Sequence, residues 1–195
     1  MIKKATRRFH SLTRGIYTSL RKFRKGSDYK RWVSVENLST SWDSRTEQIA
    51  KLIDNGTSVI EFGAGRLVLK VCLPDGCSYT PSDIVDRGSG TIICDLNREP
   101  LPNLQQYDLA VFSGVLEYVN DVPRLILYLS NYVDVIIASY AVTDLNESNR
   151  RTQGWVNDFS SMRFIELFEN DGFQCHHIEE WKKQLIYKFR KKPNT

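Results

Sequence analysis

Hydrophobic residues near the start of the chain recur every three or four positions, which is the spacing of one face of an α-helix. This apolar stripe consists of Ile2, Ala5, Phe9, Leu12, Ile16, Leu20 and Phe23. Most of the Lys and Arg residues in the same segment fall off the stripe. The pattern therefore predicts a basic amphipathic helix that ends near Gly26.

Further along the chain, helical patterns alternate with short β-branched runs. The predicted helices are Ser44–Asp54, Arg66–Leu73, Asp121–Tyr132 and Ser160–Asp171. The predicted strands are Thr57–Phe62, Tyr79–Val85, Thr91–Cys94, Tyr107–Ser113, Val133–Tyr140, Phe173–Glu179 and Gln184–Arg190. This alternation is typical of a doubly wound α/β sheet, here mostly parallel with seven strands. The last two strands are joined by too few residues for a parallel crossover, so we expect a C-terminal antiparallel hairpin.

Charge divides the chain into two parts. Residues 1–31 carry eleven Lys or Arg and one acid, a net charge of +10, whereas residues 32–195 carry a net charge of −6. We therefore expect a basic amphipathic arm over residues 1–31 and one globular domain over residues 32–195. The acidic domain argues against nucleic acid as its ligand.

Several classes of protein are disfavoured by what the sequence lacks. No run of about 18 apolar residues predicts a transmembrane helix, and no uninterrupted apolar stretch near the start predicts a signal peptide. The four cysteines show no Cys-x-x-Cys spacing, and a chain of this length needs no disulfides, so we expect reduced thiols and a cytoplasmic protein. Three histidines, two of them adjacent, form no metal-ligand pattern, so we expect no metal.

A pair of glycines follows the first predicted strand of the sheet. In Glu61-Phe62-Gly63-Ala64-Gly65 the glycines lie at a strand-to-helix turn, where the backbone can approach a ligand closely. A tight turn without a ligand is the alternative. A dinucleotide site would carry a third glycine at position 68, and Val68 at that position argues against NAD or FAD.

Acidic residues follow the next two strands. Asp83 lies 18 positions beyond Gly65, where a carboxylate can accept both hydroxyls of a ribose, and Asp86 is its rival. After the third strand, Asp95 can accept a hydrogen bond from an exocyclic amine, and Leu96 can cover the face of a base. Pro81 conflicts with a central position for the second strand, because proline donates no hydrogen bond to a ladder.

The order of these elements is completed by YDLAVFSGVLEYV at residues 107–119. Together they resemble the class I S-adenosylmethionine-dependent methyltransferases, and the resemblance covers roughly residues 42–190. It implies a Rossmann-like fold whose last strand is antiparallel, with S-adenosylmethionine as the cofactor.

The resemblance also implies roles for ten residues of the cofactor site. Glu61, Gly63 and Gly65 would line the methionine and ribose part. Asp83 would hold the ribose, while Asp95 and Leu96 would meet the adenine. The end that carries the methyl group would be walled by Ser113, Gly114, Val115 and Tyr118.

Candidates for the acceptor side follow the fifth strand, where acceptors usually approach in this fold. They are Tyr140, Asp144, Trp155 and Asn157. His176 and His177 start a late strand, and we interpret them as structural. No general base is identified, so the catalytic residues stay unknown.

The leading hypothesis is methyl transfer to a small molecule or to a glycan, including a lipid-linked sugar. Oxygen is the favoured acceptor atom, with nitrogen and carbon left open. The alternative is a methyltransferase-like domain that binds the nucleoside as a scaffold or regulator. An oxidoreductase is disfavoured by Val68, and a nucleic-acid methyltransferase by the acidic domain.

The arm carries a separate hypothesis. An amphipathic helix with this charge can lie on an anionic membrane surface, so we expect residues 1–25 to attach the protein peripherally to the inner face of a membrane. Docking on the domain or on a second subunit, an organelle transit peptide and RNA binding are the alternatives. The oligomeric state stays open.

Overall fold

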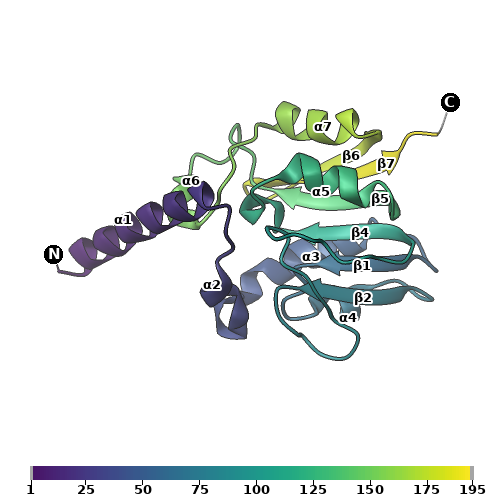
Figure 1. Ribbon diagram of the computed structural model, residues 1–195, viewed down its shortest axis with the longest axis horizontal. Helices are drawn as coiled ribbons and strands as arrows, with labels where there is room; N and C mark the ends of the chain where they lie inside the picture. Colours follow the sequence, from purple (N-terminus) through teal and green to yellow (C-terminus); the bar gives the residue numbers. More distant parts are fainter. Residues whose placement is uncertain (1, 194–195) are drawn as a thin grey trace.

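The computed structural model describes the backbone of residues 2–193 and the side chains of residues 13–193. A seven-stranded sheet forms its centre, in the order β3-β2-β1-β4-β5-β7-β6 (Figure 1). The first five strands pair in parallel, and β7 pairs antiparallel with both β5 and β6. The predicted Rossmann-like α/β sheet with its C-terminal hairpin is therefore confirmed.

The strands lie close to their predicted positions. They are β1 (Ser58–Phe62), β2 (Ser78–Asp83), β3 (Ile92–Ile93), β4 (Tyr107–Ser113), β5 (Val133–Tyr140), β6 (Phe173–Trp181) and β7 (Gln184–Lys191). The second strand ends two residues earlier than predicted, which makes Asp83 its final residue. The carboxyl ends of the parallel strands share one edge of the sheet, so side chains there come together from distant parts of the chain.

Helices cover both faces of the sheet, because successive side chains of a strand point to opposite faces. On one face, Ile60 and Ala110 pack with α5 (Val122–Leu129) and α7 (Ser161–Asn170). On the other face, Val59 and Leu109 pack with α3 (Asp43–Ala50) and α4 (Val68–Cys72). This double burial explains why the central strands read as continuous apolar runs.

The sheet accommodates Pro81 because of the shortness of β3. Pro81 pairs with Glu61 in the ladder between β1 and β2. On its other side β2 is paired only at Ser82 and Asp83. At Pro81 the strand is therefore an edge strand, a position in which proline is tolerated, and the expected conflict does not displace Asp83.

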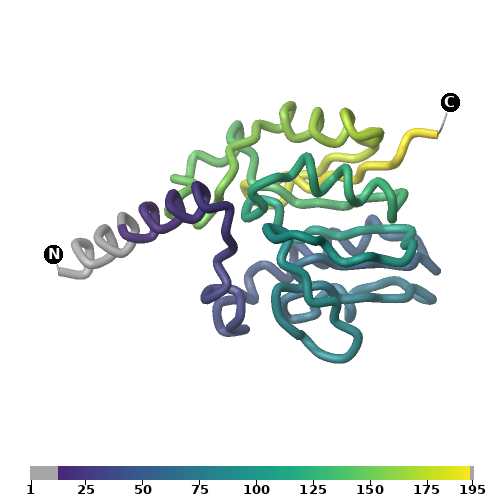
Figure 2. Tube along the Cα trace, in the orientation of Figure 1, coloured from purple at the N-terminus to yellow at the C-terminus, as the bar shows by residue number. Residues whose placement is uncertain are grey.

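The arm forms α1 (Ile2–Phe23), as predicted, and the structure contains further short helices that the pattern did not predict. These are α2 (Tyr29–Val33), η1 (Val35–Asn37), η2 (Thr40–Trp42) and η3 (Leu116–Tyr118), together with α6 (Arg150–Gln153). Helix α1 packs against α6 near the carboxyl edge of the sheet (Figures 1 and 2). The stripe residues Ile2, Ala5, Phe9 and Leu12 lie outside the side chains that the structure describes.

Candidate functional site

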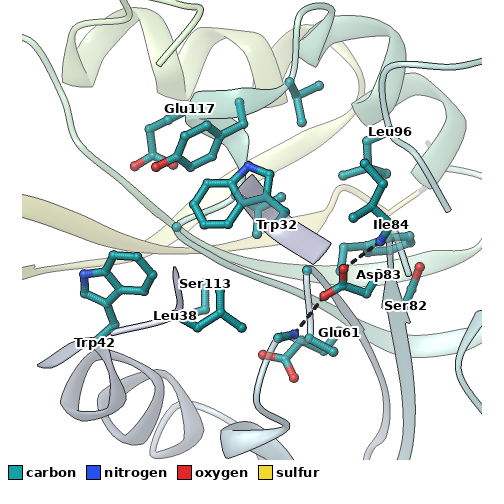
Figure 3. Close-up of a pocket in the computed structure, with 18 of the residues that line it drawn as sticks. Trp32, Leu38, Trp42, Glu61, Ser82, Asp83, Ile84, Leu96, Ser113 and Glu117 are labelled. Carbon is teal, nitrogen blue, oxygen red and sulfur yellow. Dashed lines mark hydrogen bonds between the residues drawn. The ribbon is translucent and has the colours of Figure 1, made fainter. Parts of the chain in front are cut away.

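A pocket opens at the carboxyl edge of the sheet, above the ends of β1, β2 and β4. All ten residues expected from the sequence at a cofactor site line it: Glu61, Gly63, Gly65, Asp83, Asp95, Leu96, Ser113, Gly114, Val115 and Tyr118. The segment of residues 27–46, called the strap below, covers the pocket from the other side. Figure 3 shows two sides of the pocket, with Asp83, Ile84 and Leu96 on one and Trp42 and Glu117 on the other.

The floor of the pocket is the glycine turn after β1. Gly63 and Gly65 have φ angles of 72° and 51°, a left-handed conformation that favours glycine. A side-chain carbon at position 63 would overlap the side chain of Val115. The backbone of the turn is also anchored to the next strand, since the N–H groups of Gly63 and Ala64 both donate to the carbonyl of Ser82. At the two glycines, therefore, backbone atoms and no side chains line the pocket.

Asp83 connects that turn to the end of β2. Its Oδ2 accepts from the N–H of Gly65 at 2.9 Å and its Oδ1 from the N–H of Ile84 at 2.7 Å (Figure 3). The guanidinium of Arg87 forms an ion pair with the same carboxylate at 3.1 Å and donates to the carbonyls of Trp32 and Val33. Asp83 is thus fixed beneath the strap. The rival Asp86 is exposed and accepts from the N–H of Gly88 within its own loop.

The next part of the pocket wall follows β3. Asp95 accepts a hydrogen bond from the hydroxyl of Ser27 at 2.5 Å and from the N–H of Asn97 at 3.0 Å. Leu96 is buried and lines the pocket beside Ile84. The contact with Ser27 attaches the start of the strap to this side of the pocket, so the strap spans the pocket from one side to the other.

Glu61 places a buried carboxyl in the centre of the sheet. The hydroxyl of Tyr79 donates to its Oε2 at 2.6 Å. Burial raises the pKa of Glu61 to about 8, although the hydrogen bond from Tyr79 opposes the rise. The group therefore favours its neutral form in the folded protein at neutral pH.

The opposite wall is aromatic and basic, and most of it was not predicted. Trp32 meets the ring of Tyr118 edge-on at 4.8 Å, and the guanidinium of Arg31 lies 4.2 Å from the ring of Trp32. Trp42 also lines the pocket. The sequence alone does not assign Trp32 and Trp42 to the pocket, because no spacing rule shows which surface a loop tryptophan covers.

Arg45 is a second feature of this wall that no motif singles out. It is buried, and its guanidinium donates to Ser113 Oγ at 3.2 Å, to the carbonyl of Ser113 at 2.9 Å and to Gln184 Oε1 at 3.0 Å. Gly114 lies so close that a side-chain carbon there would overlap the guanidinium. All three hydrogen-bond partners are uncharged, and burial lowers the pKa of Arg45. The end of β4 therefore carries a buried positive charge at the pocket wall.

Glu117 faces the same end of the pocket from η3. Its Oε1 accepts from the N–H of Ala141 at 2.9 Å. Its Oε2 is buried and has no hydrogen-bond partner in the part of the chain that the structure describes. Burial raises the pKa of Glu117, and the nearby guanidinium of Arg45 opposes this rise.

Of the four candidates for an acceptor side, only Trp155 lines the pocket, where its Nε1 donates to the hydroxyl of Tyr118 at 3.2 Å. Tyr140 and Asn157 bond to each other in the interior, and Asn157 donates to the carbonyls of Leu116 and Val119. Asp144 accepts from the N–H of Ser161 at the start of α7. None of these three residues lines the pocket, and only Asn157 is hydrogen-bonded to the segment of η3 that forms part of its wall.

The late histidines lie away from the pocket on β6, where His177 approaches Glu179 at 3.5 Å. Across the side chains that the structure describes, no cluster of His, Cys, Asp and Glu is arranged to hold a metal ion. Within residues 2–193, no helix has both the length and the apolar composition needed to cross a membrane.

Comparison with known proteins places this pocket in context. A family model described as a methyltransferase domain matches residues 34–178. No curated protein matches the chain at a significant level.

Solved structures share the fold at low sequence identity. The 1,6-didemethyltoxoflavin-N1-methyltransferase of Burkholderia thailandensis, solved with S-adenosylhomocysteine, is 15% identical with a TM-score of 0.64 over 85% of this chain and 84% of its own. The mitomycin 7-O-methyltransferase MmcR is 15% identical with a TM-score of 0.62 over 80% and 56% of the two chains. The cyclase SpnF is 14% identical with a TM-score of 0.63 over 78% and 81%.

Proposed function

The chain belongs to the class I S-adenosylmethionine-dependent methyltransferases, and we propose that it methylates an oxygen of a small molecule or of a glycan, including a lipid-linked sugar. The convergence of ten residues in one pocket is the observation that supports this proposal most strongly. These residues come from four separate stretches of the chain between residues 61 and 118. The resemblance in sequence implied these residues without reference to atomic positions, so their presence around one pocket supports the proposal.

The cofactor would lie across the glycine turn, with its adenosine toward Asp83 and Leu96. Asp83, whose carboxylate contacts the backbone N–H groups of Gly65 and Ile84 and the guanidinium of Arg87, would accept the ribose hydroxyls. Asp95 and Leu96 would contact the adenine. Ser27 bonds to Asp95 and Arg87 to Asp83, so the strap would close over the same part of the ligand.

The methionine part would extend toward the ends of β1 and β4. Glu61, Gly63 and Gly65 would line it, and Ser113, Gly114, Val115 and Tyr118 would wall the methyl-bearing end. The hydrogen-bond partners of the buried guanidinium of Arg45 are uncharged there, so a further anion beside it would lower the cost of burying its charge. The carboxylate of the methionine would supply that anion.

The acceptor would bind on the side of the tryptophans. Trp32, Trp42 and Trp155 line the pocket there, and aromatic faces provide a large apolar contact area for a flat molecule or for the apolar face of a sugar ring. Two similar structures are named as methyltransferases of small molecules. The tryptophans and these likenesses support a compact acceptor.

Two measurements test this function on the full chain. Isothermal titration should give micromolar affinity for S-adenosylhomocysteine and none for NAD, because Val68 crowds the place of a pyrophosphate. Methyl-labelled S-adenosylmethionine, offered with a panel of phenols, hydroxy acids and glycosides, should then transfer its label to one class of hydroxyl. Binding of S-adenosylhomocysteine with transfer to none of the panel would favour the scaffold or regulator instead.

Helix α1 supports a second proposal, that the enzyme attaches to an anionic membrane surface. The helix docks on α6 through its polar face: Thr18 is 1% exposed, and Arg21 donates to the carbonyl of Gly154 at 2.8 Å. The described part of the apolar stripe faces outward, with Ile16, Leu20 and Phe23 exposed by 63%, 53% and 88%. The stripe therefore does not pack on the domain over this part of the helix.

Charge favours a lipid surface over a second copy as the partner of this stripe. Arg14, Arg24 and Lys25 are exposed near the stripe, within a segment whose net charge is +10. Two copies packed through this face would bring two such segments together, whereas anionic headgroups would neutralise them. The pocket lies at the carboxyl ends of the parallel strands, and α1 lies on the same side of the sheet (Figure 1), so a membrane-bound acceptor would be within reach.

Vesicle co-sedimentation tests the attachment. The protein should bind vesicles with about 30% phosphatidylserine and not pure phosphatidylcholine, and added salt should weaken binding because it screens charge. Phe23→Glu should remove binding, while Met162→Glu, an exposed apolar residue on α7, should not. A dimer in light scattering that Phe23→Glu dissolves would show instead that the stripe joins two copies.

A further inference from the structure

Glu117 is the carboxylate of the pocket with the least support from other groups. Its side chain is 1% exposed and lies on the side of Trp42, opposite Asp83 (Figure 3). Oε1 is held by the N–H of Ala141, which fixes the carboxylate between the ends of β4 and β5. Oε2 is buried without a hydrogen-bond partner among the described residues. A buried acceptor of this kind costs free energy unless a ligand supplies the missing donor.

The other acids of the pocket are already engaged by side chains. Glu61 accepts from Tyr79, Asp83 from Arg87, and Asp95 from Ser27. Asp28 and Asp43 form ion pairs with Arg21 and Arg66. Within the described part of the pocket lining there is no histidine. Glu117 is therefore the acid of the described lining whose carboxylate forms no ion pair and accepts no hydrogen bond from a side chain.

The position of Glu117 relative to β4 agrees with a role in accepting a proton. It follows Ser113 and Gly114 by a few residues, and these two would wall the methyl-bearing end of the cofactor. The positively charged Arg45 and Arg150 lie near enough to stabilise the ionised carboxylate, while burial raises the pKa and favours the neutral form. A carboxylate balanced in this way can gain and lose a proton.

We propose that Glu117 Oε2 accepts the proton of the acceptor hydroxyl during methyl transfer. The acceptor oxygen forms a bond to the methyl carbon as the bond between that carbon and sulfur breaks. The electron pair of the broken bond stays on sulfur, and the hydroxyl proton moves to Oε2. This step rests on the proposed function, because it requires S-adenosylmethionine in the pocket.

Sinefungin tests the position of the carboxylate without a known acceptor, because it carries a protonated amine where S-adenosylmethionine carries its methyl group. Titration calorimetry should show Glu117→Gln weakening sinefungin binding about tenfold, the effect of one charge-assisted hydrogen bond. Binding of S-adenosylhomocysteine should change less than twofold. The amide oxygen that this substitution introduces can still accept from the N–H of Ala141, and Glu36→Gln, an exposed residue outside the pocket, is the matched control.

The outcomes separate this inference from the function on which it rests. Equal losses for both ligands would show a structural role, and unchanged sinefungin binding would show that Glu117 does not face the methyl position; either result overturns the inference. Glu117→Asp, which keeps the charge, should retain part of the preference for sinefungin. Failure of the unaltered protein to bind either ligand would contradict the proposed function instead.

With an acceptor from the panel described above, Glu117→Gln should lower kcat about 100-fold or more while KM changes less than threefold. A KM effect without a kcat effect would assign Glu117 to acceptor binding and would overturn proton transfer.

Discussion

The two sides of the pocket are built in different ways. The side of Asp83 consists of residues at or just after the ends of successive parallel strands. Asp83 and Asp95 accept hydrogen bonds from backbone N–H groups at the same edge of the sheet. The side of Trp42 combines the strap, the start of α3, η3 and the loop around Trp155. Here the contacts join residues far apart in the chain, such as Arg45 to Gln184 and Trp155 to Tyr118.

This difference suits the two sides of the pocket to different ligands: strand ends to a shared cofactor, and loops and added helices to a particular acceptor. A strand end is fixed by the ladder of the sheet, so a ligand that every member shares can be held there with few residues. Loops and added helices change without disturbing the sheet, and they form the surfaces that select a particular acceptor. We therefore expect the two sides to respond separately to mutation.

The largest effect is expected from Gly65→Val. Gly65 has a φ of 51°, and a side-chain carbon there would lie 3.2 Å from Leu38 of the strap. Valine should both strain the turn and fill the cofactor site, so titration calorimetry should detect no S-adenosylhomocysteine binding, a loss of at least about 100-fold. Gly56→Val is the control, because Gly56 has a similar φ of 73° with nothing within 4 Å. Equal losses in both variants would contradict a cofactor role for this turn.

A loss of more than about tenfold in S-adenosylhomocysteine affinity is expected from Asp83→Ala, because the two ribose hydroxyls lose a charged acceptor. Asp86→Ala should change the affinity less than twofold, since Asp86 is exposed and bonds within its own loop. The same calorimetric titration compares the two variants. The reverse result would place the ribose at Asp86, in the loop directly after β2, and would contradict the assignment of Asp83.

A pH-dependent effect on stability is expected from Glu61→Gln. The pKa of Glu61 is raised from 4.5 to about 8 in the folded protein, so ionisation of this group opposes folding increasingly between those pH values. Thermal melts should therefore show the variant gaining stability relative to the unaltered protein as the pH rises from 5 to 8. A constant difference across this range would show that Glu61 is ionised in the fold.

The smallest effect on cofactor affinity is expected from Trp155→Leu. Trp155 lies on the side of the pocket where we propose that the acceptor binds, and its Nε1 donates a hydrogen bond to the hydroxyl of Tyr118 at 3.2 Å. S-adenosylhomocysteine affinity should change less than about twofold, and methyl transfer to the identified acceptor should fall at least about tenfold. A large loss of cofactor affinity with Trp155→Leu would show that the two sides are not separate.

Most of the sheet and one side of its pocket were predictable from local patterns. The strands Tyr107–Ser113 and Val133–Tyr140 were predicted with their observed bounds, because buried parallel strands are apolar on both faces. Asp83 was predicted at a strand end, and the short β3 explains why Pro81 did not interfere.

The side of the pocket around Trp42 could not be predicted in the same way, for a physical reason. The bond from Arg45 to Gln184 spans 139 positions, and no periodicity in the sequence records such a contact. Tyr140 and Asn157 follow the fifth strand as expected, but their bond to each other turns both into the interior. The role that we propose for Glu117 rests on an oxygen without a hydrogen-bond partner among the described residues, a feature that only atomic positions reveal.

A crystal structure of the full chain with S-adenosylhomocysteine tests the central claim most directly. The ribose hydroxyls should lie within hydrogen-bonding distance of Asp83, and the sulfur should lie beside Gly114 with its open side toward Glu117 and the tryptophans. Adenosine bound away from Asp83, or a sulfur that faces neither Gly114 nor Glu117, would contradict the division of the pocket into a cofactor side and an acceptor side.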